Sequence, residues 1–189
     1  MKMYQPKKVI DLGSQNDYSF PHLPAPYISE WWLSMGVDYT CVDLNGENNA
    51  WILDLAETMN GRDDLMPTDI KYDMVLDIGT SEHIGRAGKF DWEAIYNCWE
   101  SKFDMCKTMG LIVSENPKTG NWPGHSFQFY TEEFYHQLEA EAGLQMIDIG
   151  EVCAMGNCQD GRNVYSVYIK ISDAFPDLET FKTFSLKQS

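Results

Sequence analysis

The chain has 189 residues, 43% of them hydrophobic, and its 29 acidic and 14 basic residues give a formal net charge of −15. This length is enough to bury one core and short for two, so we expect a single domain over residues 1–189. The acidic balance argues against nucleic-acid and membrane-surface partners, because both attract clustered Lys and Arg. The sequence has no apolar run near the ~18 residues of a membrane span and no signal-peptide pattern, so a cytoplasmic protein is expected.

The cysteines form an odd set without a Cys-x-x-Cys pair: Cys41, Cys98, Cys106, Cys153 and Cys158. We expect them to be reduced and mostly structural, although Cys153 and Cys158 are close enough along the chain to meet across a turn. No His or Cys partners accompany them at ligand spacing. The sequence therefore predicts no metal site.

The first half of the chain alternates short apolar runs with turns. "KVIDL" (residues 8–12) predicts a buried strand that ends at a glycine turn. Prolines exclude helix from the next stretch, and apolar spacing then predicts a helix over residues 27–35. Strands follow at 39–43 and near 51–54. The continuously apolar segment 72–78 predicts a strand buried on both faces, which is typical of a parallel sheet.

The second half predicts two helices and three strands. From Asp91, apolar residues recur at helical spacing as far as Cys106, and Gly110 is expected to close this helix. A strand follows at 111–117, and Thr131 is expected to cap a helix that stops at Gly143. Residues 144–152 and 164–171 predict two strands whose link is too short for a crossover helix, so they should pair antiparallel. The tail, 172–189, either packs back as a short helical turn or frays.

This order of elements predicts an α/β fold with a doubly wound, Rossmann-like sheet. We expect about seven strands, mostly parallel with an antiparallel last strand, and helices on both faces. Such sheets bind ligands at the carboxyl ends of their strands, near the point where the strand order reverses. Polar residues and glycines end four of the predicted strands: Gly13 and Ser14, Asp43, Asp54, and residues 77–79.

These motifs, in this order, resemble those of the class I S-adenosylmethionine-dependent methyltransferases over about residues 8–171. "VIDLGSQN" resembles the glycine motif, "CVDLNG" the motif whose acid holds the ribose hydroxyls, and "LDLAE" the motif near the adenine. "YDMVLDIGTSEHI" resembles the fourth motif, including its Glu-His pair. The resemblance implies S-adenosyl-L-methionine as cofactor and the following binding residues: Asp11, Gly13, Ser14, Gln15, Asp43, Leu44, Asn45, Asp54, Leu55, Asp77, Ile78 and Gly79.

Several alternatives stay open. The glycine motif has a single glycine followed by residues with side chains, which favours a cofactor-binding protein without transferase activity as a second hypothesis. A lyase reaction on the same sulfonium is a third. A nicotinamide-binding domain fits poorly, because Gly-x-Gly-x-x-Gly is missing and a terminal hairpin has no place in it. Asp43 alone is explained by ribose binding or by an ordinary turn cap.

The acceptor side is expected to come from loops 18–27, 79–92 and 118–129, which contain aromatic residues and few basic ones. This composition favours a small or medium organic acceptor. His83 and His125 are the candidate general bases, because His titrates near neutral pH and both lie in these loops. The structural alternative is that His83 packs at a helix start and that His125 lies in a plain surface loop.

Overall fold

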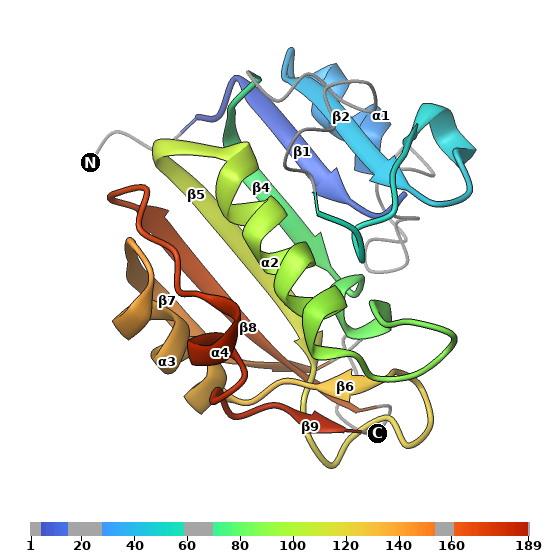
Figure 1. Ribbon diagram of the computed structural model, residues 1–189. Helices are drawn as coiled ribbons and strands as arrows, with labels where there is room; N and C mark the ends of the chain where they lie inside the picture. Colours follow the sequence, from blue (N-terminus) through green and yellow to red (C-terminus); the bar gives the residue numbers. More distant parts are fainter. Residues whose placement is uncertain (1–4, 15–27, 59–69, 154–160, 189) are drawn as a thin grey trace.

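The computed structural model describes residues 5–14, 28–58, 70–153 and 161–188. A seven-stranded sheet in the order β3-β2-β1-β4-β5-β8-β7 forms its centre (Figure 1). The strands are β1 (Lys8–Leu12), β2 (Asp38–Asp43), β3 (Trp51–Ile52), β4 (Tyr72–Ile78), β5 (Cys106–Pro117), β7 (Leu144–Cys153) and β8 (Arg162–Lys170). Neighbours from β3 to β5 pair parallel, and β8 pairs antiparallel with both β5 and β7. The predicted mixed sheet with an antiparallel last strand is confirmed.

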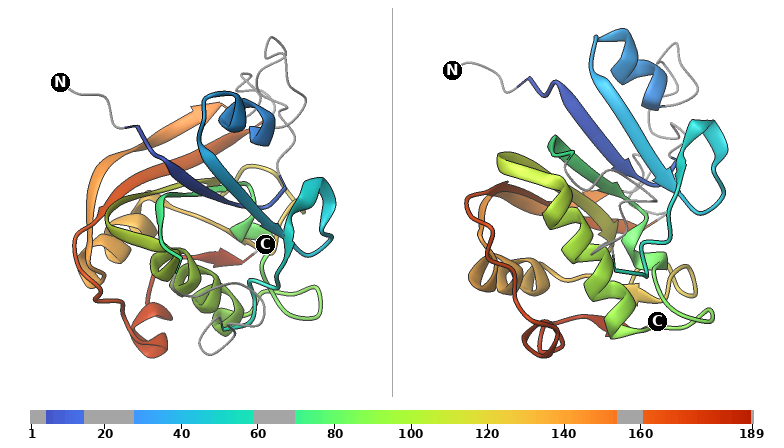
Figure 2. Two further views of the ribbon diagram at one scale, coloured as in Figure 1. Left: turned by 90° about the horizontal axis from the view of Figure 1, so that it is seen from above. Right: turned by 45° about the horizontal axis from the view of Figure 1, so that its top comes forward.

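Helices cover both faces of this sheet. One face carries α2 (Trp92–Met105), α3 (Glu132–Glu141) and α4 (Leu178–Phe181), and the other carries α1 (Ile28–Ser34), as Figure 2 shows. The larger core lies beneath α2, α3 and α4, where Trp99, Phe134 and Phe181 are fully buried. A smaller cluster around Val9 faces α1. Two short 3-10 turns, η1 (Glu47–Asn49) and η2 (Ser81–His83), follow β2 and β4.

The two long helices begin at side chains that accept a backbone hydrogen bond. The carboxylate of Asp91 accepts from the Ala94 N–H at 2.9 Å, and the hydroxyl of Thr131 accepts from the Phe134 N–H at 3.0 Å. Each cap satisfies a donor that has no partner within its own helix. The predicted starts of both helices are therefore confirmed.

The predicted end of α2 is wrong. The helix stops at Met105, and Cys106 takes an extended conformation and begins β5. Gly110 lies inside this strand, where an added Cβ would come within 2.8 Å of the Cys106 Sγ and 3.0 Å of the Asp73 carbonyl oxygen. This glycine thus allows two strands to approach closely and does not end a helix.

The tail packs against the body of the protein, which was one of the two alternatives. Phe181 and Phe184 are buried against α3, and β9 (Lys187–Gln188) pairs antiparallel with β6 (Gln128–Phe129). The strand expected near residues 51–54 is shorter than predicted and covers only Trp51–Ile52.

The expectation of five reduced cysteines is wrong for one of them. Cys41, Cys98 and Cys106 are free and buried, whereas Cys153 at the end of β7 is disulfide-bonded. Cys158 lies outside the described residues. Among the helices of the described ranges, none has both the length and the apolar character needed to cross a membrane.

Candidate functional site

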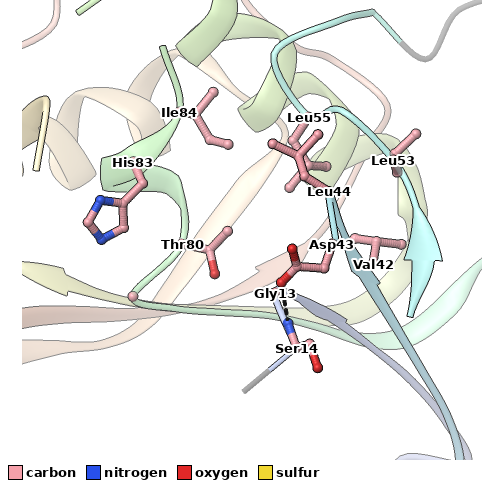
Figure 3. A pocket seen from close by; sticks show the side chains of 11 residues that line it. Gly13, Ser14, Val42, Asp43, Leu44, Leu53, Leu55, Thr80, His83 and Ile84 are labelled. Carbon is pink, nitrogen blue, oxygen red and sulfur yellow. Dashed lines mark hydrogen bonds between the residues drawn. The ribbon is translucent and has the colours of Figure 1, made fainter. Parts of the chain in front are cut away.

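A pocket of about 270 Å³ opens at the carboxyl ends of β1, β2 and β4. It lies where the strand order reverses between β1 and β4, which is the usual ligand position in open α/β sheets. Turns after these strands and the segment after β3 supply its lining (Figure 3): Gly13, Ser14, Val42, Asp43, Leu44, Leu53, Leu55, Gly79, Thr80, His83 and Ile84. Its volume lies just below the range for small-molecule sites, roughly 300–1,000 Å³.

The turn after β1 presents backbone to the pocket. Gly13 has a φ of 108°, which favours a residue without a side chain, and its N–H donates to the Val42 carbonyl at 2.8 Å. The next N–H, of Ser14, donates to the Asp43 Oδ2 at 2.9 Å, and Figure 3 marks this bond. The ends of β1 and β2 are therefore fixed to each other at the pocket.

Asp43 is half-buried and has two backbone donors. Besides the Ser14 N–H, its Oδ1 accepts from the Asn45 N–H at 3.2 Å, which is the pattern of a turn cap. An ionised carboxylate has about four acceptor positions, so two remain for hydroxyl groups of a ligand. The cap is thus present in the structure, and it leaves room for the ribose interaction that the resemblance implies.

One wall of the pocket is apolar. Leu44, Leu53 and Leu55 lie on one side, and Thr80, His83 and Ile84 lie across from them (Figure 3). Leu53 and Leu55 are buried, whereas the side chain of Leu44 is 64% exposed and can cover a flat ring. Leu44 and Leu55 were among the predicted binding residues, and both line the pocket.

Asp77, another predicted binding residue, lies in the core beneath the pocket. Its carboxylate pairs with the Lys102 Nζ at 2.5 Å and accepts from the Ser81 Oγ at 2.6 Å and the Ser81 N–H at 3.0 Å. The ammonium of Lys102 also lies 3.2 Å from the centre of the Trp99 ring. These bonds hold Asp77 in the interior and fix η2, the turn that carries His83.

Asp11 is also buried beneath the pocket and does not line it. Its Oδ2 accepts from the Tyr39 hydroxyl at 2.9 Å, and its Oδ1 has no hydrogen-bond partner within the described ranges. Burial raises the pKa of Asp11 to about 7, and the negative charge of Asp77 adds to the rise.

The remaining predicted binding residues fall into four groups. Gly79, at the end of β4, lines the pocket. Asn45 and Ile78 are next to lining residues without lining the pocket themselves, and Asp54 is exposed and accepts from the Ala56 N–H at 2.9 Å. Gln15 lies outside the described residues, as does the loop 18–27.

The two candidate bases lie together. The rings of His83 and His125 meet edge to face with 4.8 Å between their centres, and His125 also packs on Trp122. His83 lines the pocket, and burial, with the neighbouring His125, lowers its pKa. A neutral imidazole at this position is able to accept a proton at neutral pH.

Sequence reasoning missed Glu82 and Asn116. The Glu82 side chain is only 1% exposed, its Oε1 is 3.6 Å from the His83 Nε2, and its Oε2 accepts from the Asn116 Nδ2 at 3.0 Å. Burial and the charge of Asp77 raise the pKa of Glu82 to about 8. The Glu-His pair was recognised in the sequence, but no role was assigned to Glu82. Asn116 was interpreted only as part of the end of the strand over residues 111–117.

Many solved structures resemble the chain, and three of them are described below, whereas no family model and no curated protein matches it. The 1,6-didemethyltoxoflavin-N1-methyltransferase of Burkholderia thailandensis, with 1,6-didemethyltoxoflavin and S-adenosylhomocysteine bound, has a TM-score of 0.60 at 14% identity over 89% of this chain and 72% of its own. The N-methyltransferase NodS of Bradyrhizobium japonicum WM9, in complex with S-adenosylhomocysteine, has a TM-score of 0.60 at 12% identity, over 88% of this chain and 79% of its own. The O-methyltransferase from a trans-AT PKS multienzyme of Brevibacillus brevis, in complex with S-adenosylhomocysteine, has a TM-score of 0.55 at 12% identity, over 88% of this chain and 67% of its own.

The chain therefore has the fold of the class I S-adenosylmethionine-dependent methyltransferases. The strand order, the antiparallel strand β8 and the pocket at the reversal point agree with this class.

Proposed function

We propose that the protein transfers a methyl group from S-adenosylmethionine to a small or medium organic acceptor. The observation that carries this proposal is the half-buried Asp43 at the rim of a pocket between the ends of β1, β2 and β4. The three structural neighbours named above are methyltransferases, and all three have S-adenosylhomocysteine bound. The net charge of −15 disfavours polyanionic acceptors and nucleic acid.

The cofactor would occupy the side of the pocket between Gly13 and Leu55. The backbone of Gly13 and Ser14 allows close approach, the two unused acceptor positions of Asp43 would bind the ribose hydroxyls, and Leu44 and Leu55 would contact the adenine. The acceptor would then lie toward His83, across the pocket. Two other predicted residues, Asp11 and Asp77, are buried and would support these contacts from behind, whereas Asp54 is exposed beside Leu55.

The reaction needs little help from acidic or basic groups. The nucleophilic atom of the acceptor forms a bond to the methyl carbon while the carbon–sulfur bond breaks and sulfur keeps the electron pair, so the protein mainly orients the two reactants. Where the nucleophile carries a proton, neutral His83 would accept it and His125 would hold the ring.

Calorimetric titration and product analysis test the proposal on the full chain. S-adenosylhomocysteine should bind, and at about 100 times its Kd it should stabilise the native state by about 2.7 kcal/mol. A panel of small phenols, amines and carboxylic acids should yield methylated product and S-adenosylhomocysteine in equal amounts. Absence of binding at millimolar ligand would refute the proposal.

The two alternatives give different results in the same assays. Binding without turnover on the whole panel would identify a cofactor-binding protein. A cleaved sulfonium without a methylated acceptor would identify a lyase.

A further inference from the structure

Glu82, His83 and His125 place three ligand atoms of metal-binding type within 4.8 Å of one another. The Glu82 Oε1 is 3.6 Å from the His83 Nε2, and the His83 and His125 rings are in contact. Two ligands that each lie about 2.0–2.2 Å from one ion are roughly 3–3.6 Å apart. The Glu82 and His83 atoms therefore already have about the separation that a shared ion requires, and His125 needs only a side-chain adjustment.

Several hydrogen bonds fix the two segments that supply these side chains. The Phe127 N–H donates to the Glu82 carbonyl at 3.0 Å, and the Gln128 Nε2 donates to the Ser81 carbonyl at 2.5 Å. These bonds tie the loop of His125 to η2, which carries Glu82 and His83. The three side chains are thus held on one rigid frame although His125 is 42 positions beyond His83 in the sequence.

The carboxylate of this group is also oriented by a neighbour. Asn116 donates to the Glu82 Oε2 at 3.0 Å and is itself held by the Tyr135 hydroxyl, which donates to its Oδ1 at 2.8 Å. This leaves the Glu82 Oε1 directed at His83. Hydrogen-bonded partners that orient a ligating carboxylate in this way are a regular part of metal sites.

Lys102 does not occupy this carboxylate. The Glu82 side chain is buried, and the nearby buried ammonium group of Lys102 pairs with Asp77 at 2.5 Å. The immediate neighbours of the Glu82 carboxylate are therefore Asn116 and His83.

We propose that Glu82, His83 and His125 bind one divalent first-row transition-metal ion, such as Zn²⁺ or Mn²⁺. Two imidazoles and one carboxylate are a donor set that suits these ions and leaves coordination positions open. His83 lines the pocket, so a ligand in the pocket would have access to an ion held there. The sequence predicted no metal site, because the ligand spacing considered there was that around the cysteines.

Such an ion would select acceptors with an oxygen donor, for example a hydroxyl next to a carbonyl or a second hydroxyl. Bound to the ion, that hydroxyl releases its proton to water more readily. This part rests on the proposed function, and it would replace proton transfer to His83, because the same ring nitrogen cannot serve both roles. Metal binding itself does not depend on the cofactor.

The test measures metal binding to tag-free protein that has first been treated with a chelator. Titration with Zn²⁺, and with Co²⁺ as a coloured substitute, should show one strong site per chain and a rise in melting temperature. His125→Ala changes an exposed side chain and should fold normally. It should weaken binding by at least the ~10–100-fold that a change in a supporting residue costs.

His136→Ala is the matched control, because His136 is an exposed histidine on α3 with Glu139 at 4.0 Å. It should leave the metal affinity unchanged. Glu82→Gln should weaken binding as His125→Ala does, with circular dichroism confirming its fold. The proposal would be overturned if the wild type bound neither ion, with or without chelator treatment. It would also be overturned if the wild type and His125→Ala bound the metal with equal affinity.

S-adenosylhomocysteine titrations of the same samples keep the two proposals apart. Cofactor binding with no metal site would leave the proposed function standing and remove this inference. A metal site without cofactor binding would do the reverse.

Discussion

Replacing Asp43 by Ala should lower both cofactor affinity and stability, by different amounts. The carboxylate accepts from the backbone N–H groups of Ser14 and Asn45, so its loss should cost about 1–2 kcal/mol of unfolding free energy. Two hydrogen bonds from ribose hydroxyls to a charged carboxylate contribute roughly 1.5–3 kcal/mol each. Losing both should weaken binding of S-adenosylhomocysteine by about 100-fold or more.

Asp177→Ala provides the matched control. Asp177 caps α4 by accepting from the Thr180 N–H at 2.8 Å and lies away from the pocket. Its removal should lower stability slightly and leave the affinity unchanged. Calorimetric titration and denaturant unfolding of the wild type and both variants separate the two effects. If Asp43→Ala loses stability yet binds S-adenosylhomocysteine like the wild type, Asp43 is only a turn cap and our reasoning on the ribose is refuted.

Two further predictions concern buried charges. Lys102→Met leaves the Asp77 carboxylate buried without its partner and should cost about 3–5 kcal/mol in denaturant unfolding; a loss below about 1 kcal/mol would contradict the buried pair. For Asp11, the folded-state pKa of about 7 lies above the usual 3.8, so its contribution to stability falls as pH rises from about 4 to about 7. Asp11→Asn should remove this loss of unfolding free energy, which amounts to about 4 kcal/mol at pH 7 and above. If the variant and the wild type show the same dependence of stability on pH, this prediction is wrong.

Elements with strong local signals were predictable from the sequence. The apolar spacing and the capping residues Asp91 and Thr131 identified α2 and α3, because these features depend on residues within one or two turns. The run of apolar residues in β4 identified a strand buried on both faces, and the short link between β7 and β8 required an antiparallel pair.

Features that depend on distant residues were not predictable. Gly110 looks like a helix stop in the sequence, but the approach of Asp73 from β4 decides its role. Asp77 looks like a ligand at a strand end, but Lys102, a helical residue 25 positions later, draws it into the core. The residues near Gly110 or Asp77 in the sequence carry no information about such distant partners. The expectation that ligands bind at the carboxyl ends of the strands therefore identified the position of the pocket better than the residues that line it.

The acceptor side shows the same limit. His83 and His125 were predicted as separate candidates in two loops, and their contact arises only because β4 and β5 are neighbours in the sheet. Glu82 is adjacent to His83 in the sequence. Its burial and its contact with Asn116, which make it a candidate functional residue, depend on the packing of distant segments.

The small sheet formed by β6 and β9 couples the tail to the loop of His125. Within the part of the chain that the structure describes, two residue pairs join these strands, Gln128 with Gln188 and Phe129 with Lys187, and both β9 residues are exposed. So short a ladder opens at a lower free energy than the central sheet, and amide hydrogen exchange there should be correspondingly fast. Release of the tail would loosen the wall opposite Asp43 while the seven-stranded sheet stays intact, so changes at residues 187 and 188 offer a way to alter the rate of ligand exchange without touching the groups that contact the ligand.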